Sequence, residues 1–201
     1  MFRFFRNLVL VLAFAAFTAA SVLLWSSPDP LYTVQEWVNL GRFSSYDDLI
    51  AEQSKRHHVD PLLVKAMVWR ESAFDANKVG TSGERGLMQV GDAAGQDWAK
   101  AGKIETFLPT DLFDARTNLD AGTWYFHRAL ERWKGKDDPI PFALAEYNAG
   151  ASRVDRWIAQ SGLGEKVDAH DLLNAIDFPG TRRYVEEIMA RQRFYKDRGG
   201  M

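Results

Sequence analysis

The chain has 201 residues, of which 46% are apolar and 26% are charged, so its composition is that of a globular protein and excludes a disordered or fibrous chain. The formal charge of −2 comes from 25 basic and 27 acidic residues, so no overall positive field favours nucleic acid as a partner. The absence of cysteine excludes disulfides, thiol nucleophiles, thiolate metal sites and a lipid-modified N-terminal cysteine.

The N-terminal segment, residues 1–25, is predicted to span a membrane. Leu8 to Leu24 carries no charge, and as a helix it would be roughly 26 Å long, close to the thickness of the hydrocarbon core of a bilayer. Arg3 and Arg6 precede this run, so the positive-inside rule leaves a short N-terminus in the cytoplasm and the rest of the chain outside. A cleaved signal peptide is the alternative, because Thr18-Ala19-Ala20 offers small residues at a cleavage site. The apolar run continues past that point to Trp25, which favours an uncleaved anchor.

The remainder of the chain is predicted to be helical. Residues 26–45 form a spacer, in which Leu31 to Phe43 has the apolar spacing of a short amphipathic helix, and residues 46–201 form one domain. Start and stop signals predict seven helices in this domain, listed here with the predicted capping or opening residues. The first three run to about His58 with Ser45 as the cap, from Leu62 to Ser72 with Asp60 as the cap, and to about Lys100 with Asp92 as the cap. The other four run from Asn118 to Trp133 with Thr117 as the cap, from Asp138-Pro139 to Gly150, from Val154 to Gln160 with Ser152 as the cap, and to about Arg198 with Thr181 as the cap. Because no alternation typical of strands is present, the expected fold is all-α, with at most a minor hairpin near Val79 to Gly86.

Glu71 is the main candidate for a catalytic group. It lies at the end of a predicted helix, four residues after Met67, on the stripe that is expected to face the core. Cleavage of a glycosidic bond needs a carboxylic acid that stays protonated near neutral pH, and partial burial beside apolar groups is the usual means. A lone Glu-Ser pair, here Glu71-Ser72, is commonly an ordinary surface feature, so the interpretation depends on companion motifs.

The first companion motif is Gly86-Leu87-Met88-Gln89, which begins fifteen residues after Glu71. Glycines at 83 and 86 permit a tight turn of the backbone toward a saccharide. The amide of Gln89 can both donate to and accept from an N-acetyl group, whereas Leu87 is expected to pack in the core.

Two later motifs, residues 145–150 and 178–185, complete the pattern. The first places Tyr147 and Asn148 just before a helix stop, where a plain helix end with a buried tyrosine is the alternative interpretation. The second includes Tyr184. Together the four motifs resemble the lytic transglycosylases of the soluble-lytic-transglycosylase, goose-type-lysozyme-like family, and the resemblance covers about Tyr46 to Arg193.

The resemblance implies a lysozyme-like, goose-type helical domain that cleaves peptidoglycan glycan strands. It implies that Glu71 is catalytic and that the hydroxyl of Tyr147 hydrogen-bonds near its carboxylate. The substrate-binding residues that it implies are Ser72, Gly86, Met88, Gln89, Asn148 and Tyr184. The chain departs from the family pattern after Gln89, where the family has a methionine-proline pair and a threonine, and at Gly180, where the family has Glu.

The expected reaction leaves 1,6-anhydromuramic ends, with Glu71 acting first as acid and then as base toward the 6-hydroxyl of the substrate. A water-using muramidase of the same fold and a non-catalytic wall-binding or scaffold protein of a secretion or division machine are the alternatives. No cofactor is implied, and the four histidines, at 57, 58, 127 and 170, show no metal-binding spacing. The expected location is the inner membrane, with a single pass and the catalytic domain in the periplasm; a secreted periplasmic protein is the alternative.

Overall fold

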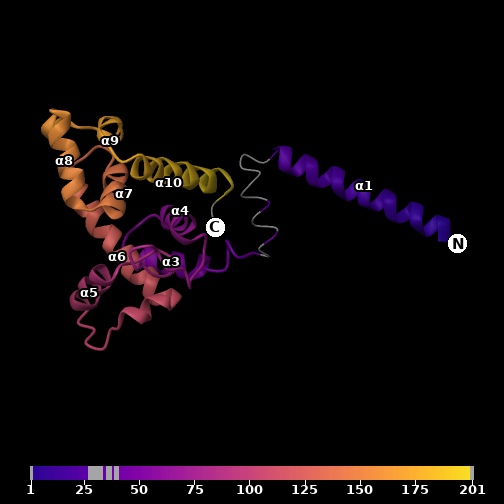
Figure 1. Cartoon of the computed structure of the whole chain (residues 1–201), viewed down its shortest axis with the longest axis horizontal. Coiled ribbons are helices and arrows are strands. Elements are labelled where there is room, and N and C mark those ends of the chain that lie inside the picture. Colours follow the sequence, from indigo (N-terminus) through magenta and orange to yellow (C-terminus); the bar gives the residue numbers. More distant parts are fainter. Residues whose placement is uncertain (1, 27–33, 35–37, 39–40, 200–201) are drawn as a thin grey trace. The chain divides into compact units, whose positions relative to one another are not determined.

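The structure is a computed structural model and describes residues 2–26, 34, 38 and 41–199 (Figure 1). The chain divides into two compact units, residues 1–43 and residues 44–201. The amphipathic helix expected at Leu31 to Phe43 falls largely on residues outside the described ranges.

The first unit contains α1, which runs from Phe2 to Ser26. Within it, Phe5–Val22 is long and apolar enough to cross a membrane, a test that signal sequences also pass. Two hydroxyl side chains within Phe5–Val22 bond to their own helix, Thr18 to the carbonyl oxygen of Phe14 at 2.6 Å and Ser21 to that of Phe17 at 2.8 Å. These bonds satisfy the hydroxyl protons internally, as an apolar surrounding requires.

The second unit is built from helices joined by loops. Its elements are α3 (Asp47–Arg56), α4 (Pro61–Ser72), α5 (Asp92–Ala101), the 3-10 helix η1 (Pro109–Phe113), α6 (Ala115–Trp133), α7 (Ile140–Ala149), α8 (Ala151–Ser161), the 3-10 helix η2 (Gly164–Lys166), α9 (Ala169–Ala175) and α10 (Pro179–Asp197). Among the residues that the structure describes, extended pairing is limited to two isolated bridges, Val79 with Arg85 and Arg85 with Val90. The all-α prediction is therefore confirmed, and the loop between α4 and α5 holds the short hairpin-like turn.

The core lies where four helices meet. α6 packs against α7, and α10 packs against both α4 and α7 (Figure 1). Fully buried apolar side chains from all four helices fill this junction: Leu63, Met67, Leu119, Phe126, Phe142, Val185 and Ile188. This packing brings the end of α4, the end of α7 and the first turns of α10 together, although they are far apart in the sequence.

Helix starts differ from the sequence predictions by a few residues. Asp60 caps α4 as predicted, accepting a hydrogen bond from the backbone N–H of Leu62 at 2.8 Å. The predicted Thr117 cap is wrong, because Asp114 accepts from the Thr117 backbone N–H at 2.9 Å and α6 starts three residues earlier. Thr181 lies inside α10 and caps nothing; its hydroxyl donates to the side-chain oxygen of Asn148 at 2.8 Å.

The predicted caps at Ser45, Asp92 and Ser152 are also wrong. α3, α5 and α8 begin after Tyr46, Gly91 and Gly150, and none of these helices has a side-chain cap. The helices η1 and α9 were not predicted, because five and seven residues are too few for helical periodicity to be recognised.

Candidate active site

Glu71 lies in the last turn of α4, at the point where the chain leaves the helix. Ala73 and Phe74 follow with φ angles of 49° and 62°, in the left-handed region that most residues avoid. Phe74 is held in this conformation by complete burial of its ring, at 1% exposure. The sharp exit ends α4 at Ser72 and leaves the carboxyl group of Glu71 at the helix end.

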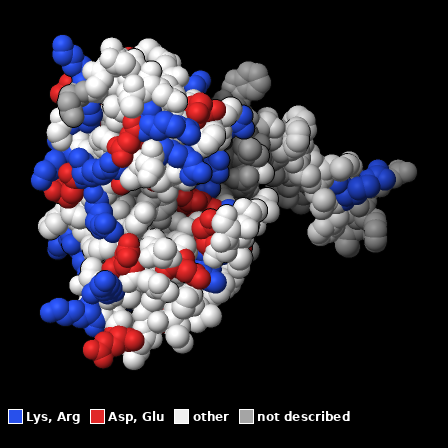
Figure 2. Space-filling model, turned by 60° about the vertical axis from the view of Figure 1, so that its left-hand side comes forward, with Lys and Arg blue, Asp and Glu red and all other residues white. Residues whose placement is uncertain are grey.

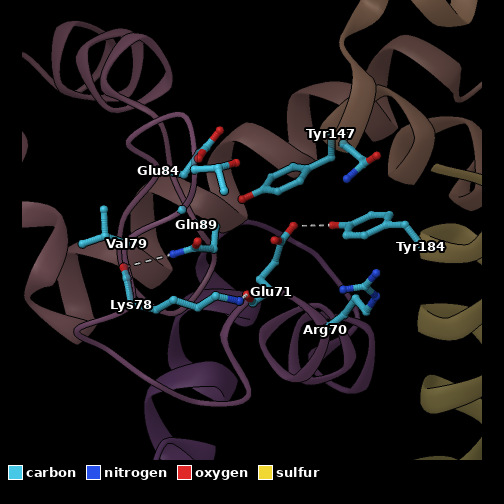
Figure 3. Close-up of a pocket in the computed structure, with 11 residues that line it drawn as sticks. Arg70, Glu71, Lys78, Val79, Glu84, Gln89, Tyr147 and Tyr184 are labelled. Carbon is cyan, nitrogen blue, oxygen red and sulfur yellow. Dashed lines mark hydrogen bonds between the residues drawn. The ribbon is translucent and has the colours of Figure 1, made fainter. Parts of the chain in front are cut away.

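A cavity of about 410 Å³ opens beside Glu71 (Figure 3). The end of α4, the loop before α5, the end of α7 and the start of α10 all contribute to its wall. Five of the residues predicted from the sequence line it: Glu71, Gln89, Tyr147, Asn148 and Tyr184. Six more were not assigned to the site from the sequence: Arg70, Lys78, Val79, Gly80, Thr81 and Glu84.

Tyr184 holds the carboxyl group of Glu71. Its hydroxyl donates to Glu71 Oε1 at 2.6 Å across a sequence separation of 113 residues (Figure 3). Burial nevertheless raises the pKa of Glu71 from 4.5 to about 7. The Tyr184 hydrogen bond and the positive charges of Arg70 and Lys78 oppose this rise, whereas the negative charge of Glu84 adds to it. Glu71 can therefore both donate and accept a proton near neutral pH.

The two tyrosines beside Glu71 remain protonated. Burial, followed by the negative charge of Glu71, raises the pKa of both Tyr147 and Tyr184 well above the ordinary value for a phenol. Tyr147 was expected to bond near the carboxyl group, yet its hydroxyl donates to the backbone carbonyl oxygen of Met88 at 2.8 Å. The hydroxyl that contacts Glu71 is that of Tyr184.

Asn118 fixes the loop that carries Gly86 to Gln89. This fully buried side chain accepts from the backbone N–H of Met88 and donates to the carbonyl oxygens of Arg85 and Leu112, each at 2.7 Å. Gly86 has a φ of 74°, and a Cβ at this position would lie 2.3 Å from the Asn118 amide nitrogen. Glycine is therefore required there by both conformation and space.

Gln89 faces the cavity with one end of its amide. Its Nε2 donates to the carbonyl oxygen of Lys78 at 3.1 Å (Figure 3) and to that of Gly86 at 3.0 Å, so the two acceptors identify the nitrogen. The prediction that this amide both donates and accepts is therefore too broad. The nitrogen is occupied within the loop, and Oε1 is the atom available to a ligand.

Three predicted substrate-binding residues do not line the cavity. Ser72 is buried, and its hydroxyl donates to the Val68 carbonyl oxygen at 3.2 Å. Met88 is fully buried, as is Leu87, which was expected in the core. Gly86 is buried against Asn118. These residues support the site through the backbone and the core, because helix and loop geometry turn them away from the cavity.

Asn148 is the exposed member of the α7 motif and is positioned by Thr181, whose hydroxyl bonds its side chain. Gly180, where the family pattern has Glu, is exposed, and a Cβ there would meet no atom within 4 Å. A side chain at this position would therefore extend into open space.

Two acidic residues near the motifs are engaged elsewhere. Glu146 accepts from the indole N–H of Trp133 at 2.7 Å and from Arg132 at 2.8 Å. Asp92 pairs with Arg85. Neither side chain lines the cavity, which leaves Glu71 and Glu84 as the carboxyl groups that do so among the described residues.

One cluster of the described residues has metal-ligand character, namely Asp168, His170 and Asp171, whose ligand atoms lie within 4.8 Å of one another. Asp168 and Asp171 each accept from the backbone N–H of the other, so the two carboxylates cap α9. Helix capping accounts for this acidic pair.

Over the face of the molecule in Figure 2, basic and acidic side chains are interspersed, in keeping with the small net charge.

Comparison with known proteins identifies the helical unit. The Transglycosylase SLT domain family model matches residues 48–169. The soluble lytic murein transglycosylases of Salmonella typhimurium and Escherichia coli K12 are each 28% identical over 153 residues, 76% of this chain and 23% of those proteins. The chain thus spans less than a quarter of the length of these relatives.

Solved structures agree with the sequence match. The 70 kDa soluble lytic transglycosylase of Escherichia coli superposes with a TM-score of 0.69 at 28% identity, covering 77% of this chain and 24% of that one. A complex of the 70 kDa soluble lytic transglycosylase with bulgecin A gives a TM-score of 0.71 at 28% identity, covering 80% and 26%. The match over most of the helical unit, in sequence and in fold, establishes that the chain belongs to the Transglycosylase SLT domain family.

Proposed function

We propose that this chain is a lytic transglycosylase that cleaves the β-1,4 bond between N-acetylmuramic acid and N-acetylglucosamine in peptidoglycan, leaving 1,6-anhydromuramic ends. The observation that carries the proposal is the position of Glu71 in a cavity, with a pKa of about 7 and a phenol donating to its carboxyl group. The names of the relatives, soluble lytic murein transglycosylases, support the substrate class.

Glu71 acts twice in this mechanism. Its protonated carboxyl group donates to the linking oxygen as the bond to the anomeric carbon breaks, and positive charge develops at that carbon. The resulting carboxylate then accepts the proton of the 6-hydroxyl of the same muramic residue, whose oxygen bonds to the anomeric carbon. Tyr184 stabilises the carboxylate between the two steps, because its hydroxyl donates to Oε1 and its pKa is too high for it to lose its proton.

The location follows from α1. We propose that this helix anchors the protein in the inner membrane, with a short N-terminus in the cytoplasm and the catalytic domain in the periplasm, where peptidoglycan lies. No cofactor takes part in the proposed chemistry. A secreted periplasmic protein is the outcome if α1 is removed as a signal sequence.

Digestion of purified peptidoglycan by the full-length chain in detergent, read by mass spectrometry, tests the proposal. The wild-type protein is expected to release anhydro-ended muropeptides, which lack one water relative to hydrolytic products. Glu71→Gln keeps the shape of the side chain but cannot transfer protons, so cleavage should fall by about 10⁴-fold, the upper end of what general acid–base catalysis contributes. Glu186→Gln, at an exposed carboxyl group on α10, is the matched control and should retain activity.

Three results would contradict the assignment. Reducing ends without anhydro ends would make the protein a muramidase. Binding of glycan without any cleavage would make it a wall-binding or scaffold protein. Normal cleavage by Glu71→Gln would remove Glu71 from the mechanism. As a separate check, bulgecin A, which is found in complex with a relative, is expected to inhibit the wild-type reaction.

A further inference from the structure

The cavity holds a second carboxyl group, Glu84, that the proposed mechanism does not use. Glu84 lies on the loop that carries Val79 and Gln89, on the opposite side of the cavity from Tyr184 (Figure 3). Its charge contributes to raising the pKa of Glu71, which means that the two carboxyl groups are within electrostatic reach of each other. They enter the cavity from different segments, Glu71 from the end of α4 and Glu84 from the loop.

The loop is shaped around the Glu84 side chain. Glu84 Oε2 accepts a hydrogen bond from the backbone N–H of Ser82 at 3.1 Å. The backbone carbonyl oxygen of Glu84 accepts one from the backbone N–H of Gly80 at 2.7 Å. A Cβ on Gly80 would lie 2.3 Å from Glu84 Oε2 and 2.9 Å from Gln89 Oε1. The absence of a side chain at Gly80 therefore lets two acceptor groups converge on one side of the cavity.

The closing of the turn uses only one carboxylate oxygen. Within the described ranges, Ser82 is the hydrogen-bond donor to the Glu84 side chain, and the oxygen that it reaches, Oε2, lies beside Gly80 and keeps a second lone pair. Gln89 Oε1 is likewise open, because its amide nitrogen is bonded to the loop. Two acceptors that flank the open space at Gly80 suit a water molecule, which can donate both protons to them and direct its lone pairs toward the saccharide.

We propose that Glu84 is the general base of a second, water-using branch of the reaction at this site, with Gln89 orienting the water. The inference rests on the proposed function, because it uses the same cleaved bond and the same acid. Glu71 donates its proton to the linking oxygen and the bond from that oxygen to the anomeric carbon breaks. The water oxygen bonds to the anomeric carbon while one water proton passes to Glu84, and the product is an ordinary reducing end. Solvent then carries a proton from Glu84 back to Glu71.

The water-using branch is measured by the ratio of reducing ends to anhydro ends among the products. The full-length wild-type and Glu84→Gln proteins are each incubated in detergent with purified peptidoglycan that has first been reduced with borohydride. The digestion is run in water enriched in a heavy oxygen isotope. New reducing ends then carry the isotope, whereas anhydro ends do not. A reducing muropeptide incubated without enzyme measures exchange of its anomeric oxygen with solvent.

Glu84→Gln is chosen because Gln keeps an oxygen for the Ser82 backbone N–H and so preserves the turn. The wild-type protein is expected to give anhydro ends together with isotope-labelled reducing ends. In Glu84→Gln the reducing ends should fall by about 10²-fold, the lower range of general-base catalysis, while anhydro ends persist. Asp92→Asn removes a carboxylate that follows the same loop but pairs with Arg85, and should leave the ratio unchanged.

Several outcomes would overturn the inference. If the wild-type protein gives anhydro ends alone, Glu84 serves no water-using branch and the proposed function stands. If Glu84→Gln gives an unchanged ratio, or loses both products together, Glu84 is not a base dedicated to water. If the wild-type protein gives neither product, the proposed function fails and this inference fails with it.

Discussion

Replacing Glu71 by Gln should stabilise the protein at alkaline pH, because the native structure holds this carboxyl group where ionisation is unfavourable. The pKa of Glu71 rises from 4.5 to about 7, chiefly through burial. One pKa unit corresponds to about 1.4 kcal/mol, so ionised Glu71 lowers the free energy of unfolding by about 3 kcal/mol.

The direction follows from the raised pKa. Below pH 4.5 the carboxyl group is protonated in both the folded and the unfolded chain, so it costs nothing. As the pH rises from about 4.5 to about 7 the unfolded chain releases the proton first, and the stability of the folded state declines. Above about pH 7 Glu71 is ionised in the folded state as well, and the full loss of about 3 kcal/mol in the free energy of unfolding applies. Gln does not ionise, so the Glu71→Gln protein avoids it.

Urea denaturation of the full-length chain in detergent, followed by the fluorescence of its seven tryptophans, measures the effect. The free energy of unfolding of Glu71→Gln minus that of the wild-type protein should increase by about 3 kcal/mol between pH 4 and pH 8. Other titrating groups cancel in this difference, since both proteins contain them. A difference that stays constant across this range would refute the burial argument, and with it the reason for treating Glu71 as a proton donor near neutral pH.

The site and the anchor give four further predictions. Tyr184→Phe should lower the rate of glycan cleavage by about 10- to 100-fold, because it removes the hydroxyl that donates to the Glu71 carboxyl group. The same change should raise the pKa of Glu71, which is measured from the pH dependence of the rate. Tyr147→Phe should instead lower the free energy of unfolding by about 1 kcal/mol, since its hydroxyl bonds the Met88 carbonyl; a shift in the pH profile as large as that of Tyr184→Phe would contradict this. Asn118→Ala should lower the free energy of unfolding, measured by urea denaturation, by about 3 kcal/mol, because three backbone groups, two of them in buried contacts, lose their partner. An unchanged free energy of unfolding would show that the loop does not depend on Asn118. N-terminal sequencing of the mature protein should recover the intact α1 in the membrane fraction, whereas a chain that begins near Ser21 in the soluble fraction would identify a signal peptide.

The sequence alone was sufficient for the fold class and for most of the site. Helical periodicity and start signals identified the long helices, because a helix of ten or more residues repeats its apolar spacing often enough to be recognised. The first residue of several helices differs from the sequence prediction. Asp114 and Thr117 both have capping side chains, and the choice between them depends on the backbone conformation that precedes α6.

The motifs also indicated Glu71, Gln89, Tyr147, Asn148 and Tyr184, and all five side chains line one cavity. What the sequence could not decide was the direction of each polar group. Whether Tyr147 or Tyr184 donates to Glu71 depends on how α7 and α10 pack against α4, a contact between residues more than a hundred positions apart.

Glu84 shows the same limit most clearly. As one acid in a loop it has no motif that distinguishes it from Asp92 or Glu146. The pairing of Asp92 with Arg85 and of Glu146 with Arg132 neutralises those two, while the turn at Gly80 directs Glu84 into the cavity. Local sequence determines which helices form and which chemical groups are available, because those depend on short-range spacing. Only tertiary packing determines which carboxyl groups share a cavity, which one loses its water, and hence which one can carry a proton at neutral pH.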